Sequence, residues 1–143
     1  MNNYNSTLQR FIDAQQHDYE TALAEIKAGR KRSHWMWYIF PQMAGLGMSD
    51  TSRFYAIENI DEAGAYLAHE TLGPRLIELC RALLQLQTDN PHHVFGSPDD
   101  QKLQSSMTLF EAVPASSPVF GQVLAKFYGG LRDQRTLSLI RQA

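Results

Sequence analysis

Apolar residues in this chain recur at intervals of three and four positions, and this spacing constrains the fold more than any other feature of the sequence. After Gly73, for example, Leu76, Leu79 and Leu83 would share one face of a helix. The spacing is repeated in other segments, and the chain contains no pair of alternating strands joined by a tight hairpin turn. The sequence therefore predicts an all-α fold, a compact single domain of about seven or eight helices.

Capping residues, glycines and prolines set the expected helix boundaries. Ser6 or Thr7 would begin a short helix that ends at residues 15–17, and a second helix would run from about Tyr19 to Gly29. Residues 35–40 would form a helical turn or a short strand, and residues 89–97 a loop. The other helices are expected to begin at Ser49 or Asp50, at Asp61, after Gly73, at Ser97 or Asp99, before Phe120 and after Asp133.

Length and composition indicate one soluble domain over residues 1–143. A chain of this size buries roughly 68–70% of its unfolded surface, and its 43% hydrophobic residues and net charge of −2 are ordinary for a globular protein. The absence of a basic excess argues against general nucleic-acid binding. No apolar run is long enough for a signal peptide or a membrane span, so we expect a cytoplasmic protein that contacts no membrane.

The segment at residues 29–52 carries the strongest indication of a binding site. Three consecutive cations run directly into the densest aromatic cluster of the chain, and glycines and serines follow. The cations would bind a phosphate or carboxylate, or would simply end a helix in solvent. The tryptophans would stack on a planar ring, or would belong to the core. The predicted ligand-binding residues are Arg30, Lys31, Arg32, Ser33, Trp35, Trp37, Gln42, Gly45, Gly47, Ser49 and Ser52, with Lys102 from a second polar cluster.

Three residues are the predicted catalytic groups. His34 lies between cations and aromatic residues, where a neutral imidazole would act as a base, although such a histidine is often only a hydrogen-bonded structural residue. Asp99 would act as an acid or base if its helix lies against His34, and otherwise would serve as a helix cap. Glu20 is a further acid candidate. Sequence alone does not show which carboxylate faces the site.

Metal and cofactor chemistry receive no support from the motifs. His92 and His93 are adjacent in a loop and lack the spacing of a helical metal site. Cys80 is the only cysteine, so the chain forms no internal disulfide and no thiolate zinc cluster, and its place on an apolar face predicts an inert thiol. The chain has no nucleophile elbow, phosphate-binding loop or dinucleotide fingerprint. We therefore predict no metal and no cofactor.

Several motifs together resemble a bacterial family of unknown function that is sometimes labelled calpastatin-like. The resemblance extends from about residue 10 to residue 137 and implies a mainly helical single domain, but it supplies no activity. The motifs that carry it are GRKRSHWMWYIFPQ, GLGMSDTSRFYAI, EAGAYL, LGPRL, FGSPDDQKLQSSMTLF and FYGGLRDQRTL.

A more remote similarity concerns the second half of the chain. The order of Asp99, Lys102 and Met107, then Lys126-Phe127, then Asp133 and Thr136 is similar to the later half of the NADAR family. The tryptophan-glycine ending of that family is absent after Asp133, where the chain reads QRTLSLI. The similarity implies action on ADP-ribose linkages and related N-glycosides.

Two classes of function follow from these patterns. The first is an enzyme that hydrolyses an N-glycosidic bond in an ADP-ribose-containing or nucleotide-like compound. The second is a non-catalytic domain that binds a small anionic ligand or a protein partner in the same cleft. An enzyme needs an acid or base facing the site, whereas a binding module needs only hydrogen-bond donors and a stacking surface.

Overall fold

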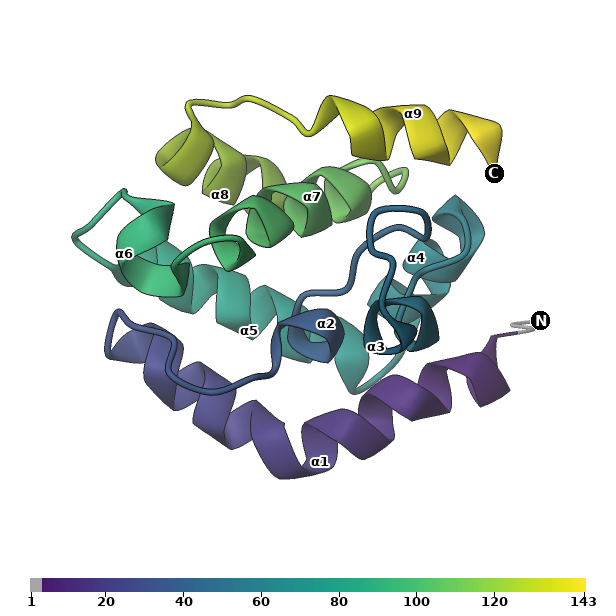
Figure 1. Ribbon diagram of the computed structural model, residues 1–143, viewed down its shortest axis with the longest axis horizontal. Helices are drawn as coiled ribbons and strands as arrows, with labels where there is room; N and C mark the ends of the chain where they lie inside the picture. The colour runs from purple at the N-terminus through teal and green to yellow at the C-terminus, as the bar shows by residue number, and fades with distance from the viewer. Residues whose placement is uncertain (1–3) are drawn as a thin grey trace.

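The computed structural model describes residues 4–143, and the regular structure in this range consists of nine helices without strands (Figure 1). The helices are α1 (Asn5–Lys27), α2 (Met36–Ile39), α3 (Asp50–Phe54), α4 (Ile60–Ala68), α5 (Leu72–Gln85), α6 (Pro91–Phe95), α7 (Asp99–Glu111), α8 (Val119–Tyr128) and α9 (Gln134–Gln142). They enclose one hydrophobic core. The chain is thus a compact all-α domain, as its apolar spacing predicts.

Side-chain caps fix the starts of several helices. Ser49 accepts a hydrogen bond from the amide of Ser52 at 3.1 Å and begins α3, and Asp133 accepts one from the amide of Thr136 at 3.2 Å and begins α9. Both caps agree with the sequence prediction. Helix α4 begins earlier than predicted, because Asn59 rather than Asp61 provides the cap.

Other helix boundaries also differ from the predictions: α1 begins at Asn5 with Tyr4 as its N-cap, α5 begins at Leu72, and α7 begins at Asp99 without a side-chain cap from Ser97 or Asp99. Helix α1 continues through residues 15–17, where the side chain of Gln15 is buried. Its Nε2 donates hydrogen bonds to the carbonyl of Tyr38 and the hydroxyl of Tyr66, each at 2.9 Å. Gln15, whose polarity favours a helix end, therefore lies in the middle of α1 and joins it to Tyr38 and Tyr66 in the interior. The predicted loop at residues 89–97 contains α6, which Asn90 caps through the amide of His92 at 2.9 Å.

Helix α5 lies at the centre of the fold. It packs against α1, α4 and α8, while α7 packs against α8, α9, α6 and α4. Figure 1 shows α1 along one side of the molecule and α9 along the opposite side, with the start of α1 and the end of α9 towards the same end. The core includes the buried side chains of Leu79, Leu83, Phe110, Leu124 and Phe127.

The carboxyl end of α5 is closed by a lysine from α8. Nζ of Lys126 donates hydrogen bonds to the carbonyls of Leu83 at 3.2 Å and Leu84 at 3.1 Å, and also to that of Leu86. These carbonyls belong to the last turn of α5 and have few partners within the helix. The ammonium group therefore stabilises the end of α5 and joins it to α8.

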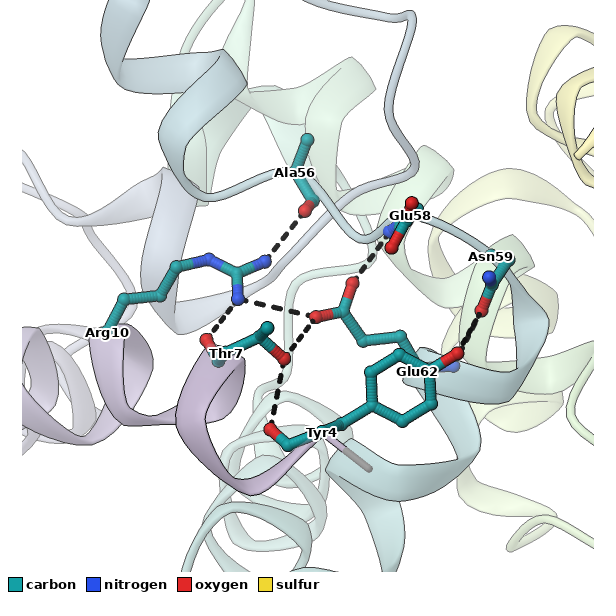
Figure 2. Close-up of polar contacts among 7 residues, drawn as sticks. All are labelled: Tyr4, Thr7, Arg10, Ala56, Glu58, Asn59 and Glu62. Carbon is teal, nitrogen blue, oxygen red and sulfur yellow. Dashed lines mark hydrogen bonds and ion pairs between the residues drawn. The ribbon is translucent and has the colours of Figure 1, made fainter. Parts of the chain in front are cut away.

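A buried ion pair joins α1 to α4 (Figure 2). Nη1 of Arg10 lies 3.3 Å from Oε2 of Glu62, whose side chain is only 3% exposed. Oε1 of Glu62 accepts a hydrogen bond from the amide of Glu58 at 2.7 Å, and Nη2 of Arg10 donates to the carbonyl of Ala56 at 2.8 Å. The pair thereby fixes the chain between α3 and α4. Within residues 4–143, none of the helices has both the length and the apolar character that a membrane span requires.

Candidate functional site

Glu25 organises the segment that follows α1. Its Oε1 accepts hydrogen bonds from the amides of Arg32 and Ser33, at 2.8 and 3.0 Å, and from Nε1 of Trp35 at 2.9 Å, while Oε2 accepts from the Ser33 hydroxyl at 2.6 Å. Burial alone would raise the pKa of Glu25, but these hydrogen bonds outweigh it and lower the pKa to about 2. An ionised carboxylate therefore holds the basic segment in one conformation.

Asp99, at the start of α7, is shared between two lysines. Its Oδ2 lies 2.9 Å from Nζ of Lys31, and its Oδ1 lies 3.0 Å from Nζ of Lys102. Burial acts to raise the pKa of Asp99, but the hydrogen bonds and charges of the two lysines lower it below its usual range. Each ammonium also faces a tryptophan, with Lys31 4.9 Å from the Trp35 ring centroid and Lys102 4.3 Å from that of Trp37.

The first pocket, here the His34 pocket, has a volume of about 170 Å³. The structure brings His34, Asp99 and Lys102 together in it, as the sequence analysis expects if α7 lies against the aromatic segment. His34 is exposed at its edge. The complete lining is Lys31, His34, Trp35, Met36, Trp37, Tyr38, Thr51, Asp99 and Lys102.

The second pocket, here the Asp133 pocket, has a volume of about 350 Å³ and shares Trp37 and Lys102 with the first. Oδ2 of Asp133 accepts hydrogen bonds from the hydroxyl of Ser105, at 3.0 Å, and from the amide and hydroxyl of Thr136. The carboxylate is thus held rigidly in the wall. The complete lining is Trp37, Gln42, Leu46, Pro98, Gln101, Lys102, Gln104, Ser105, Asp133 and Arg135.

A third pocket, here the Gly47 pocket, has a volume of about 150 Å³. A Cβ atom at Gly47 would lie 2.5 Å from the side chain of Ser52 and 3.0 Å from the Trp37 ring, so only glycine allows this close approach. Nη2 of Arg135 donates to the carbonyl of Gly45 at 3.0 Å and ties this loop to α9. The complete lining is Trp37, Gln42, Met43, Ala44, Gly45, Gly47, Ser52, Arg53, Tyr55 and Ala56.

Trp37 lines all three pockets, and Gln42 lines the Asp133 and Gly47 pockets. Gln42 is only 4% exposed, and no group in the described part of the chain pairs with its buried Nε2 atom. A buried donor without a partner costs about 1–3 kcal/mol. The side-chain amide of Gln42 is therefore an unsatisfied donor in the wall shared by two pockets, both of which Trp37 also lines.

Several predicted site residues lie outside this arrangement or have structural partners. Glu20 and Arg32 are exposed and line none of the three pockets, and Arg30 lies in a separate depression against α6. The Ser33 hydroxyl is bound to Glu25. Ser49 caps α3, and the hydroxyl of Ser52 donates to the Ser49 carbonyl at 2.8 Å.

Trp35 serves mainly the core. It is 1% exposed, and its ring packs against those of Phe40 and Phe95, with centroids 6.2 and 6.4 Å apart. Trp37 is therefore the ring available for stacking. Ser105 belongs by sequence to the polar cluster of Asp99 and Lys102, whereas Asp133 and Arg135 are not predicted as site residues. Asp133 is explained locally by its cap, and only the similarity to the NADAR family singles it out.

Metal ligands are not grouped in the part of the chain that the structure describes: no three histidine, cysteine or acidic side chains lie close enough to hold an ion. Cys80 is fully buried with Sγ 3.6 Å from Sδ of Met107, and burial raises the pKa of its thiol. The thiol is thus neutral in this position, whereas the reactive form of cysteine is the thiolate.

Comparison with known proteins assigns the chain to a class without a known activity. A family model described as a protein of unknown function, DUF1810, matches residues 5–140, and the chain belongs to this family. It is similar in structure to the conserved hypothetical protein Rv1873 from Mycobacterium tuberculosis, with a TM-score of 0.91 and 47% sequence identity. The match covers 94% of this chain and 96% of that chain. No curated protein matches the chain.

Proposed function

We propose that this protein binds a nucleotide-like or ADP-ribose-containing compound around Trp37 and hydrolyses its N-glycosidic bond. The observation that carries the proposal concerns the side-chain amide of Gln42, whose Nε2 has no partner within residues 4–143. Gln42 lines two pockets that share Trp37. A planar heterocycle offers both a face for the ring and a polar edge for the amide. A ligand of this class would therefore satisfy the buried donor.

The charges around the Asp133 pocket suit an anionic group on the same ligand. Lys102 and Arg135 both line this pocket, and an arginine can contact a phosphate or carboxylate through two parallel hydrogen bonds. Asp99 neutralises only part of the positive charge of Lys31 and Lys102. A phosphorylated sugar would thus be held beside Trp37.

Asp133 is the carboxylate we propose as general base. Ser105 and Thr136 bind Oδ2, while no hydrogen bond to Oδ1 is found among residues 4–143. In the proposed step, Oδ1 accepts a proton from water as the water oxygen bonds to the anomeric carbon. The bond between the anomeric carbon and the nitrogen of the heterocycle breaks, and its electron pair stays on that nitrogen as the heterocycle departs. Asp133 then returns the proton to the same nitrogen. Asp99 is less suited to proton transfer, because two lysines lower its pKa.

A binding and turnover experiment tests this proposal. Wild-type protein is screened by thermal shift and calorimetry against ADP-ribose, nicotinamide nucleotides and simple phosphates, and released base is followed by chromatography. We expect Lys102→Gln and Gln42→Met to weaken binding about tenfold, since hydrogen bonds with charged or buried groups carry about 1–3 kcal/mol. We expect Asp133→Asn, which keeps the α9 cap, to bind normally and to lose about a hundredfold in rate.

The control variant is Arg32→Gln, because Arg32 is exposed and lines none of the three pockets. Its affinity should equal that of wild type. Binding that is unchanged in Lys102→Gln and Gln42→Met would exclude the site. Binding with these dependences but without released base would instead support the second candidate, a non-catalytic anion-binding domain, which is favoured by the hydrogen bonds already made to Oδ2 of Asp133.

A further inference from the structure

A separate basic depression lies where the end of α1 and the following segment meet α6. Its volume is about 520 Å³, and the residues that line it include Arg30, Lys31, His92 and His93. It shares Lys31 with the His34 pocket, but neither Trp37 nor Lys102 lines it. This α6 depression gathers three cationic or ionisable donors that the proposed reaction does not use.

A backbone hydrogen bond joins the segment that carries Arg30 to α6. The amide of Lys31 donates to the carbonyl of Val94 at 2.7 Å, which ties the segment after α1 to α6 next to Arg30. Gly29 has a φ of +81°, so the chain turns there immediately after α1. The position of Arg30 relative to the two histidines therefore results from fixed main-chain contacts.

The depression contains one cationic side chain that pairs with no acid in the described part of the chain. Arg30 has no side-chain ion pair among the described residues, and the ammonium of Lys31 is already paired with Asp99. One acid faces the histidines, because Oδ2 of Asp100 lies 3.4 Å from Nδ1 of His92. His93 adds a second imidazole with no acidic partner in residues 4–143.

We propose that the α6 depression is a binding site for a tetrahedral oxyanion, a phosphate or phosphate monoester. Arginine and imidazolium groups donate hydrogen bonds to oxyanions, and their positive charges favour a doubly charged ligand. Protonated imidazoles add positive charge, so a lower pH favours binding. The same chemistry would accept a free oxyanion or the far phosphate of a larger ligand.

Histidine NMR with sulfate as the probe tests this site, because the double charge of sulfate does not change between pH 6 and pH 8. We expect sulfate to shift the ring signals of His92 and His93, while those of His17 and His69 stay in place. Arg30→Gln should lower the sulfate affinity about three- to fivefold, as for an exposed charge pair. Arg32→Gln, which removes the same charge outside the depression, should leave it unchanged.

Two further arms decide the source of the anion and the role of the histidines. His92→Gln together with His93→Gln should abolish the increase in sulfate affinity from pH 8 to pH 6. If ADP-ribose shifts the NMR signals of His92, His93 and Trp37 together, the site binds the phosphate of a larger ligand. If only sulfate shifts the signals of His92 and His93, the site binds a free oxyanion. Equal shifts at all five histidines, or equal weakening in Arg30→Gln and Arg32→Gln, would overturn the proposal, whether or not the Trp37 pockets bind a nucleotide.

Discussion

Nε1 of Trp35 donates a hydrogen bond to the carboxylate of Glu25 at 2.9 Å, so a core aromatic ring and an α1 side chain share one polar contact. The same carboxylate binds the amides of Arg32 and Ser33. The basic segment therefore acquires its conformation from an acid on the preceding helix rather than from its own cations.

Substitution of Glu25 should destabilise the protein in a pH-dependent manner. We expect Glu25→Gln to lower the free energy of unfolding by about 1–2 kcal/mol at pH 7, because hydrogen bonds to an ionised group are lost. The pKa of Glu25 is lowered from 4.5 to about 2 in the fold, so its contribution is present above pH 4.5 and disappears as the pH falls towards 2.

Urea denaturation at pH 7, 4.5, 3 and 2 measures this difference. Glu20→Gln is the matched control, because Glu20 is exposed on the same helix, and it should match wild type at every pH. A stability gap between wild type and Glu25→Gln that stays constant down to pH 2 would contradict the role assigned to the ionised carboxylate.

Glycine at position 47 should be necessary for the packing of Trp37. In Gly47→Ala, the new methyl group would lie 2.5 Å from the Ser52 side chain and 3.0 Å from the Trp37 ring. We expect a loss of about 1–3 kcal/mol in stability, measured by thermal and chemical denaturation. Gly64→Ala is the control, since its methyl group meets only Val113 at 3.7 Å and replaces a glycine within α4. It should be neutral or stabilise by about 0.5–1 kcal/mol.

The ion pair between Arg10 and Glu62 should be costly to break from one side. Arg10→Met would leave the buried Glu62 carboxylate without its cation, and we expect a loss of about 3 kcal/mol. Adding Glu62→Gln to Arg10→Met should recover part of that loss, because the uncompensated charge is then removed. A double-mutant cycle from denaturation curves measures the coupling, and strictly additive effects would show that the two side chains do not stabilise one another.

The two tryptophans should differ in their access to solvent and ligand. Trp35 is 1% exposed, whereas Trp37 is half-buried and lines three pockets. We expect acrylamide to quench Trp37 fluorescence in Trp35→Phe much more strongly than Trp35 fluorescence in Trp37→Phe. A nucleotide ligand should change the emission only when Trp37 is present. The reverse pattern would transfer the stacking role to Trp35.

The fold is predictable from sequence wherever the determining contacts are local or periodic. Leu79, Leu83 and Phe110 are buried because helical spacing places them on inward faces. The predicted helix end at Gln15 is wrong because the hydrogen-bond partners of this side chain, Tyr38 and Tyr66, are far away in the sequence. A local pattern does not show that a glutamine is satisfied in the interior.

The candidate site is predictable only in part, for a related reason. The sequence indicates His34, Asp99 and Lys102 as chemically capable groups, and packing of α7 against the aromatic segment brings them into one pocket. Gln42 acquires its significance from burial without a partner, which depends on the tertiary structure. The position of Asp133 before α9 is fully explained by its role as a cap, so the sequence does not indicate that it lines a pocket.

The packing of α1 against α5 has a consequence for synthesis on the ribosome. The inward face of α1 includes Leu8, Phe11 and Ile26, and it packs against α2 and against α5, which begins only at Leu72. Because the chain emerges from its amino end, this apolar face has no α5 to cover it until synthesis has passed Gln85. The apolar face of α1 therefore lacks its α5 partner while residues 28–85 are translated.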